Sequence, residues 1–353
     1  MQLTYDEAEL LASHDYEAPL VAGGVRCHGG FDADGRYVSP RTRYRAPAIE
    51  AWQANHRATF GTELLDLPLS TWPGHYPNVA QARFLLESGL PGPIISSLTR
   101  IGTVEGFGGM IRLAPVPDPR RTFVEDTDGT ALAHLTGGLF EAHARDEAGF
   151  DPDGGAGDRA EGGHKQMWFA ARDVAFGQPP TEDETELMLQ RMGIGQMAKA
   201  STHRLWPDDV SIDLEMLVER MTRLLLIEIS AFHTFAWAEE LLDDADLVAG
   251  DGEAARLVSY IRADETPHVE YLKTVLTEIR DRTVVGERGR HAGAELVGAT
   301  WDRALAQSLG ERRQANLDAF RAEVAHAAHG RPDAADLLAR FDDLATPDDR
   351  PAP

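Results

Sequence analysis

The chain has 353 residues, of which 42% are hydrophobic and 26% are charged, a composition typical of a soluble globular protein with a sizeable core. Its 58 acidic residues outnumber its 34 Lys and Arg residues, which gives a formal net charge of -24. A field of this sign repels the phosphates of nucleic acids and of anionic lipids. We therefore expect neither a nucleic-acid partner nor a membrane partner.

The cysteine content and the N-terminus indicate the compartment. Cys27 is the single cysteine, so no internal disulfide can form, which is typical of a reducing compartment. Residues 1–20 carry acidic side chains where a signal peptide would carry basic ones, and no run of about 18 uncharged apolar residues follows. We expect a cytoplasmic protein.

Residues 1–125 show little sustained periodicity. Residues 14–46 are dense in Gly, Pro, Asp and Arg, which predicts an irregular, loop-rich segment. Pro47 is typical of the first turn of a short helix, and Asn78 is typical of a helix cap. Residues 91–119 combine β-branched runs with glycines and fit either a strand or a broken helix. We interpret residues 1–125 as an irregular extension that covers a helical domain.

From about residue 127 onward, long stretches rich in Ala and Leu have a helical period and are separated by short Gly, Pro and Asp clusters. We expect an all-α protein in which residues 126–285 form the main helical domain, residues 286–345 add accessory helices and residues 346–353 form a disordered tail. The predicted helices are 128–148, 158–177, 181–204, 210–244, 252–282, 291–309, 312–329 and 332–345.

Two Glu-x-x-His tetrads indicate metal chemistry: Glu161-Gly-Gly-His164 and Glu265-Thr-Pro-His268. On a helix, a step of three residues rotates about 300° and rises about 4.5 Å, so the Glu and His of a tetrad are neighbours that can bind the same ion. One tetrad occurs often by chance. Two, each in a predicted long helix, predict a dinuclear metal site. Pro267 removes a backbone donor within the second tetrad and predicts a kink there.

A dinuclear carboxylate site in a four-helix bundle needs one further carboxylate from each remaining helix. Glu228 lies in an otherwise apolar stretch, where burying an unpaired carboxylate would be costly. It is 16 residues, about 24 Å, from the helix end near Asp244, and Glu265 is 13 residues, about 20 Å, from the helix start near Gly252. The two carboxylates should therefore lie at the same level.

The other carboxylate should come from the helix over 128–148, where the acidic candidates are Glu141, Asp146 and Glu147. Glu141 is the first choice, because small residues on its face would let another helix approach. It could instead form a solvent-exposed pair with Arg145, four residues away. Glu147 is therefore the second choice, and His143 could also reach a metal.

The resulting order of ligands resembles that of the ferritin-like di-iron carboxylate superfamily, which includes ribonucleotide reductase small subunits, bacterial multicomponent monooxygenases and acyl-carrier desaturases. In that superfamily a carboxylate and a Glu-x-x-His are followed, after a longer crossover, by a second carboxylate and a second Glu-x-x-His. The resemblance covers about residues 128–282 and implies a ferritin-like four-helix bundle. In this chain the ligand order reads Glu141, Glu161, His164, Glu228, Glu265 and His268.

The resemblance also implies roles for single residues. Glu161 or Glu265 would bridge two irons, His164 and His268 would each bind one iron, and Glu141 and Glu228 would complete the site, with Glu228 moving to admit oxygen. An Asp before the last Glu commonly supports a ligand histidine in the oxygen-activating members, and Asp264 occupies that place. The equivalent place before Glu161 is Ala160, so only one half of this support is expected.

The function that the resemblance implies is a non-haem di-iron oxygenase or oxidase, which uses dioxygen to hydroxylate, N-oxygenate or desaturate a small organic substrate. The same ligand types also suit a Mn/Fe pair. The electron donor is not identified by the sequence, and a homodimer is the candidate assembly. Two alternatives are a ferroxidase or iron-handling protein of the ferritin type and a metal-free helical interaction module.

Overall fold

The computed structural model describes residues 2–151, 160–177 and 204–346. The chain is mostly helical, which agrees with the expected all-α class. No helix in these three ranges combines the length and hydropathy that crossing a membrane requires. The predicted helix at 181–204 and the predicted tail at 346–353 lie, except for residues 204 and 346, outside the described residues.

The elements follow one another in three groups along the chain. The first 125 residues hold α1 (Glu7–Leu11), β1 (Ala18–Ala22), β2 (Val25–Phe31), β3 (Tyr37–Val38), α2 (Thr42–Phe60), η1 (Leu69–Thr71), α3 (Val79–Glu87), α4 (Gly92–Gly108), η2 (Gly109–Leu113) and α5 (Pro119–Thr122). The next group is η3 (Leu132–His134), η4 (Leu135–Leu139), α6 (Phe140–Ala148), α7 (His164–Phe176), α10 (Ile212–Leu242), α11 (Glu253–Asp264) and α12 (Thr266–Arg280). The last is β4 (Thr283–Val285), β5 (Arg290–Ala292), α13 (Gly293–Leu309), α14 (Glu311–Ala327) and α15 (Ala334–Asp343).

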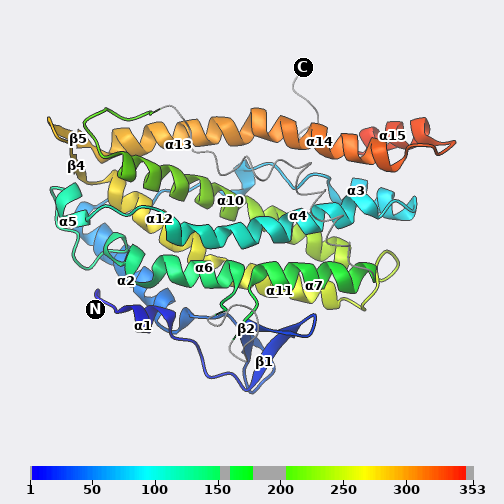
Figure 1. The fold of residues 1–353 in the computed structure, drawn as a ribbon, viewed down its shortest axis with the longest axis horizontal. Coiled ribbons are helices and arrows are strands. Elements are labelled where there is room, and N and C mark those ends of the chain that lie inside the picture. Colours follow the sequence, from blue (N-terminus) through cyan, green and yellow to red (C-terminus); the bar gives the residue numbers. More distant parts are fainter. Residues whose placement is uncertain (1, 152–159, 178–203, 347–353) are drawn as a thin grey trace.

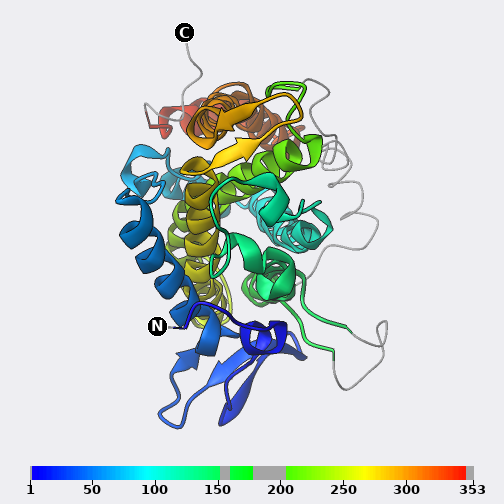
Figure 2. The same cartoon turned by 90° about the vertical axis from the view of Figure 1, so that its left-hand side faces the viewer.

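The long helices lie between two outer layers. Figure 1 shows α13, α14 and α15 along one side of the molecule and the sheet of β1–β3 on the opposite side, with α4, α6, α7, α10, α11 and α12 between them. Helix α2 packs along α12 at the edge of this arrangement, as the turned view shows (Figure 2). The N-terminal residues therefore cover one side of the interior helices.

The N-terminal segment is more regular than its composition predicted. Residues 14–46, expected to be irregular, contain an antiparallel sheet in the order β1-β2-β3. Gly23 and Gly24 form the two-residue turn between β1 and β2, with φ of 58° and 77°. Such turns need positive φ at both central positions, which glycine adopts without a steric penalty. The Gly-Gly pair was therefore a hairpin signal.

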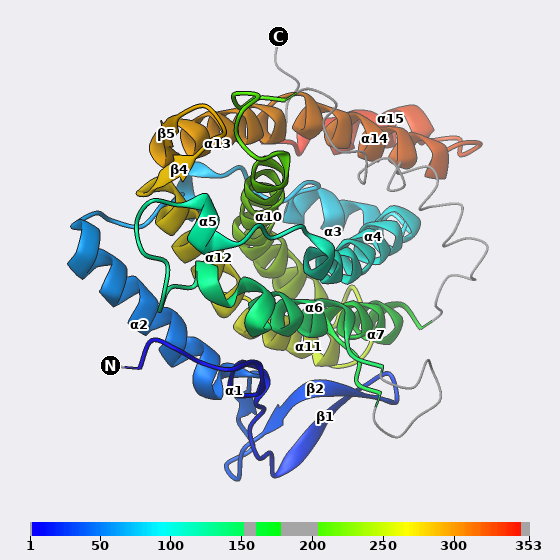
Figure 3. The same ribbon diagram turned by 60° about the vertical axis from the view of Figure 1, so that its left-hand side comes forward.

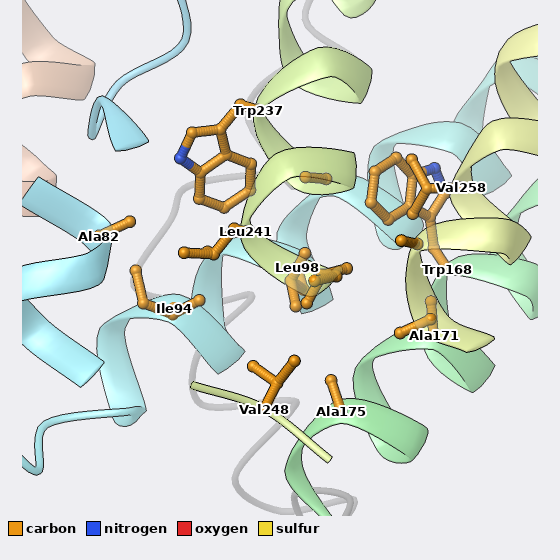
Figure 4. Packing of buried hydrophobic residues seen from close by; sticks show 14 of the residues in the cluster. Ala82, Ile94, Leu98, Trp168, Ala171, Ala175, Trp237, Leu241, Val248 and Val258 are labelled. Carbon is orange, nitrogen blue, oxygen red and sulfur yellow. The ribbon is translucent and has the colours of Figure 1, made fainter. Parts of the chain in front are cut away.

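Helix α4 resolves the ambiguous segment 91–119 as a helix. It lies inside the residues expected to form only a cover, yet it packs against α6 and α7 in the interior. Its buried apolar side chains join those of α7, α10 and α11 in one core cluster. Figure 4 shows members of this cluster around α4 and α7, among them Ile94, Leu98, Trp168, Ala171, Trp237, Leu241 and Val258.

Other predicted helices are confirmed with changed ends. The helix expected over 210–244 is α10, and the three accessory helices are α13, α14 and α15. The helix expected over 252–282 is interrupted at Glu265. Pro267 then lies in the first turn of α12, where its missing N–H has no intrahelical partner to lose.

Glycines let α4 and α7 approach closely. A Cβ built on Gly102 would lie 2.9 Å from the Cβ of Trp168 and 2.8 Å from the Phe169 ring, atoms that cannot move without displacing α7. A Cβ built on Gly106 would lie 2.8 Å from Cδ of Lys165, the flexible part of an exposed side chain. The two glycines thus face neighbours of very different rigidity.

This difference predicts opposite effects of two matched substitutions. Gly102→Ala should lower the free energy of unfolding by about 1–3 kcal/mol, because overpacking a helix contact forces side chains and backbone apart. Gly106→Ala should be neutral or stabilise by up to about 1 kcal/mol, because Lys165 can swing away and alanine favours the helix. Urea unfolding followed by circular dichroism measures both. Equal effects of the two substitutions would contradict this account of the contact.

Candidate metal centre

Side chains rich in carboxylate and imidazole converge where α4, α6, α7, α10 and α12 meet. One group of four ligand atoms comes from His143, Glu147, Glu228 and His268, and a second comes from Glu105, Glu147, His164 and Glu265. Within each group the atoms all lie within 4.8 Å of one another. All of these side chains are buried except that of Glu105, which is 12% exposed.

The structure brings four of the predicted ligands together: His164, Glu228, Glu265 and His268. The helical spacing argument holds for the second tetrad, in which Glu265 Oε2 and His268 Nδ1 are 2.9 Å apart. Glu228 reaches the same cluster from α10, as its isolated position in an apolar stretch predicted. Glu141 and Glu161 do not belong to either group.

Glu161 lies outside the cluster because it is not on a helix. Its backbone pairs with Phe150 in an isolated antiparallel bridge, and α7 begins only at His164. Because no helix joins Glu161 to His164, their spacing of three residues does not place the two side chains side by side. The Glu161 carboxylate is 33% exposed and lies 3.7 Å from the guanidinium of Arg26.

Glu141 also lies outside, in the solvent-facing pair that was its alternative role. Its Oε1 accepts a hydrogen bond of 2.7 Å from Nε of Arg145, and its side chain is 26% exposed. Arg112 lies on its other side, with 4.0 Å between the charged atoms. The small residues near Glu141 do not bring it to the cluster.

Glu147, the second choice for that ligand, takes the place expected for Glu161. Helix α6 ends at Ala148, and α7 starts at His164 roughly in line with α6 (Figures 1 and 3). A Cβ on Gly163 would lie 2.6 Å from the carbonyl oxygen of Asp146 and 2.7 Å from that of Glu147, so only glycine fits where the chain returns. Glu147 Oε1 and His164 Nδ1 are consequently 3.4 Å apart although 17 residues separate them.

Glu105 was missed by the sequence analysis. It lies on α4 within Val-Glu-Gly-Phe-Gly-Gly, a glycine-rich run that carries no recognised binding motif. A Cβ on Gly108 would lie 2.6 Å from Cγ of Glu147. The glycines therefore let α4 lie directly against the cluster, and the single acidic residue of α4, placed among glycines, was the available signal.

Both central histidines are oriented in the same way. Nδ1 of His164 lies 3.1 Å from Glu265 Oε1, and Nδ1 of His268 lies 3.1 Å from Glu147 Oε1. Each Nε2 instead faces an aspartate: His164 lies 3.4 Å from Asp264 Oδ2 and His268 lies 3.1 Å from Asp146 Oδ2. Metal-binding histidines commonly present one nitrogen to the ion and the other to a carboxylate.

This support is present on both sides of the cluster. Asp264 precedes Glu265, and Asp146 precedes Glu147. The expectation that half of the support is missing, based on Ala160, fails because Glu161 does not lie at the site. The arrangement Asp-Glu with a nearby His therefore occurs twice. Asp264, Glu265 and His268 lie on one stretch of chain, whereas Asp146 and Glu147 at the end of α6 meet His164 at the start of α7.

The N-terminal residues fix both aspartates. The hydroxyl of Tyr37 donates a hydrogen bond of 2.7 Å to Asp264 Oδ2, and Nε2 of His28 lies 3.5 Å from the same oxygen. Arg41 donates from Nε to Asp146 Oδ1 over 2.8 Å, and the Arg45 guanidinium lies 2.7 Å from Asp146 Oδ2. The sheet and the start of α2 thus hold the groups that orient His164 and His268.

Several buried polar atoms at the centre lack a hydrogen-bond partner among the described residues. They include Oε1 of Glu147, Oε1 of Glu265 and Nδ1 of His164. The Glu265 oxygen lies 3.1 Å from Nδ1 of His164 without forming a hydrogen bond, so both atoms point at shared space. Buried polar atoms without partners are rare. Carboxylate oxygens and an imidazole nitrogen that face the same space are the ligand atoms that a metal cation binds.

The protonation of the cluster reflects crowded carboxylates. Burial and the nearby Glu147 and Glu265 raise the pKa of Glu105 and of Glu228 well above the ordinary value, which favours the neutral acid form of both. Burial alone would lower the pKa of His164, but the carboxylates of Glu265 and Glu147 raise it well above its ordinary value. His268 behaves in the same way, since Glu265, Asp146 and Glu147 outweigh its burial and raise its pKa.

Two other groups at the site, Asp146 and His143, have lowered pKa values. Burial would raise the pKa of Asp146, but Arg41 and Arg45 lower it well below its ordinary value. His143 is neutral, because burial, together with His268, lowers its pKa to about 3.

Comparisons with known proteins give no relative. No protein-family model matches the chain, and neither a curated protein nor a solved structure matches it. A function for the chain therefore has to be inferred from its own side chains.

Substitutions separate the ligands in this structure from those first expected. Glu105→Gln and Glu147→Gln should each weaken binding of Fe(II) or Co(II) by more than about 100-fold, because an amide is a poor substitute for a carboxylate ligand. The matched controls are Glu141→Gln, on α6 like Glu147, and Glu161→Gln, just before α7. Both residues lie outside the cluster, so both substitutions should leave metal binding unchanged. Metal content after anaerobic dialysis measures all four. Loss of metal in the controls and not in the first pair would refute the assignment.

Metal binding should release protons. The raised pKa values of Glu105, Glu228, His164 and His268 favour their protonated forms, which must lose protons to become ligands, so protons should leave as divalent ions bind. Metal affinity should accordingly rise with pH until these raised pKa values are passed. Calorimetry in buffers of different ionisation enthalpy counts the protons, and a count near zero would contradict this protonation state.

Proposed function

We propose that the chain is a ferritin-like dinuclear metalloenzyme that binds two iron ions within its bundle of interior helices and uses dioxygen to oxidise a small organic substrate. The observation that carries this proposal is the number of charges buried together. Six carboxylates meet at the site: Glu105, Asp146, Glu147, Glu228, Asp264 and Glu265.

The charge balance favours two divalent ions. When all six carboxylates are ionised and the histidines are neutral, the site carries six negative charges, and the guanidinium groups of Arg41 and Arg45 offset two of them. Two divalent ions supply the four positive charges that remain. Without metal, the same site reaches neutrality only by binding four protons, and the raised pKa values of Glu105, Glu228, His164 and His268 favour protonation of these groups. Buried charge without such compensation would be strongly destabilising.

The donor atoms suit iron. Carboxylate oxygens together with imidazole nitrogens bind Fe(II), and manganese is the alternative ion for the same donors. The two oxygens of Glu265 each face a different histidine, at 3.1 Å from His164 and 2.9 Å from His268. Glu147 belongs to both groups and would be shared by two ions, whereas Glu265 belongs to the group of Glu105 and His164.

When bound, an iron pair supplies a binding position for dioxygen and two electrons for its reduction. With iron bound, Asp146 and Asp264 would accept hydrogen bonds from Nε2 of His268 and His164, which would leave each Nδ1 to bind an ion. Glu228 Oε1 lies 3.6 Å from His143 Nε2, and Glu228 would complete the position that Glu147 and His268 also serve. Apolar side chains of the two core clusters surround the site and limit the access of water.

The N-terminal residues favour an enzyme over a storage protein. They form a sheet and a helix that hold Asp264 and Asp146, additions for which a minimal iron-storage bundle has no need. The proposal includes a small-molecule substrate, an external electron donor, a cytoplasmic location and a homodimer as the candidate assembly.

Oxygen consumption tests the proposal. Apoprotein loaded anaerobically with two equivalents of Fe(II) and mixed with dioxygen should consume about one dioxygen per two irons and give a transient visible absorption. The Glu147→Gln variant serves as the control and should give neither. Uptake of many irons per chain with ferric product would indicate an iron-storage protein instead. Absence of bound iron would contradict a metal function altogether.

A further inference from the structure

His143 belongs to the first group of ligand atoms, but the charge balance of the proposed centre does not depend on it. Its side chain is 0% exposed, and neither ring nitrogen has a hydrogen-bond partner among the described residues. An unpaired buried polar group costs free energy, so such a residue needs an explanation. Its presence on α6 one turn before Glu147 places it directly at the cluster.

The neighbours of His143 offer no ordinary partner. Its Nε2 lies 3.6 Å from Glu228 Oε1, beyond hydrogen-bonding distance. Its ring lies 4.1 Å from that of His268 and 5.8 Å from that of Tyr271, between centroids. A nitrogen of His143 nevertheless lies within 4.8 Å of ligand atoms of Glu147, Glu228 and His268.

We propose that His143 is a third imidazole ligand, which makes the two metal positions chemically unequal. This inference rests on the proposed dinuclear centre. The imidazole-rich position has His143, His268, Glu147 and Glu228, which are two imidazoles and two carboxylates. The carboxylate-rich position has Glu105, Glu147, Glu265 and His164, which are three carboxylates and one imidazole.

Unequal donors give unequal selectivity. Imidazole suits Fe(II), Co(II) and Zn(II), whereas carboxylate-rich positions suit Mn(II), which binds most weakly to nitrogen donors among these ions. The imidazole-rich position should therefore fill first when Fe(II), Co(II) or Zn(II) is added. The carboxylate-rich position should fill second and should be the one that accepts manganese.

Anaerobic titration of the apoprotein with Co(II), followed by its visible absorption, tests this inference. The wild-type protein should bind two ions, the first at least about 10-fold more tightly than the second. His143→Ala should weaken the first ion by about 10–100-fold and bring the two affinities together. The control His75→Ala removes another imidazole with an unpaired nitrogen, which contacts Thr234 and Trp237 and belongs to neither ligand group, and it should leave both affinities unchanged.

A second measurement does not depend on the folding of a variant. Crystals of the wild-type protein loaded with both Co(II) and Mn(II) should show, by anomalous scattering at the two absorption edges, cobalt beside His143 and manganese beside Glu105. Two equal affinities, or both metals mixed equally over two positions, would overturn the inference while leaving the dinuclear enzyme intact. Failure to bind two ions at all would instead overturn the proposed function.

Discussion

The burial of carboxylates at one point is the constraint on which the rest of this structure depends. Glu147 and Glu265 lie at the centre, with Glu105 and Glu228 beside them and aspartates behind both histidines. Such a group of charges cannot be removed from water unless cations or protons accompany it. Two arginines are built in, and the positive charge still required is the physical basis for assigning two metal ions.

The surrounding fold serves the convergence of these groups. Glycines at 102, 106 and 108 bring α4 against α6 and α7, so that Glu105 reaches the centre. Gly163 lets the chain return to the end of α6, which places His164 beside Glu147. The N-terminal sheet and α2 then hold the two aspartates in place. Residues 1–125, which the sequence predicted to be only a cover, therefore also orient the side chains of the site.

Much of the fold was predictable from the sequence because helical periodicity is local. Periodicity located α10 and the accessory helices, and the tetrad Glu265 to His268 formed as predicted because only one helical step connects its members. Glu161 lies outside the cluster for a physical reason, since sequence spacing has geometric meaning only where a continuous helix joins the residues. Glu105 and the partnership of Glu147 with His164 depend on contacts between distant segments, which spacing along the chain does not encode.

The central claim is that this cluster binds two metal ions. Anomalous diffraction at the iron edge from crystals of the iron-loaded protein tests it most directly. We predict two peaks about 3.5–4 Å apart, with Glu147 between them and the Nδ1 atoms of His164 and His268 directed at different peaks. A structure of the iron-loaded protein with no peak among these side chains, or with iron only at surface carboxylates, would contradict the account.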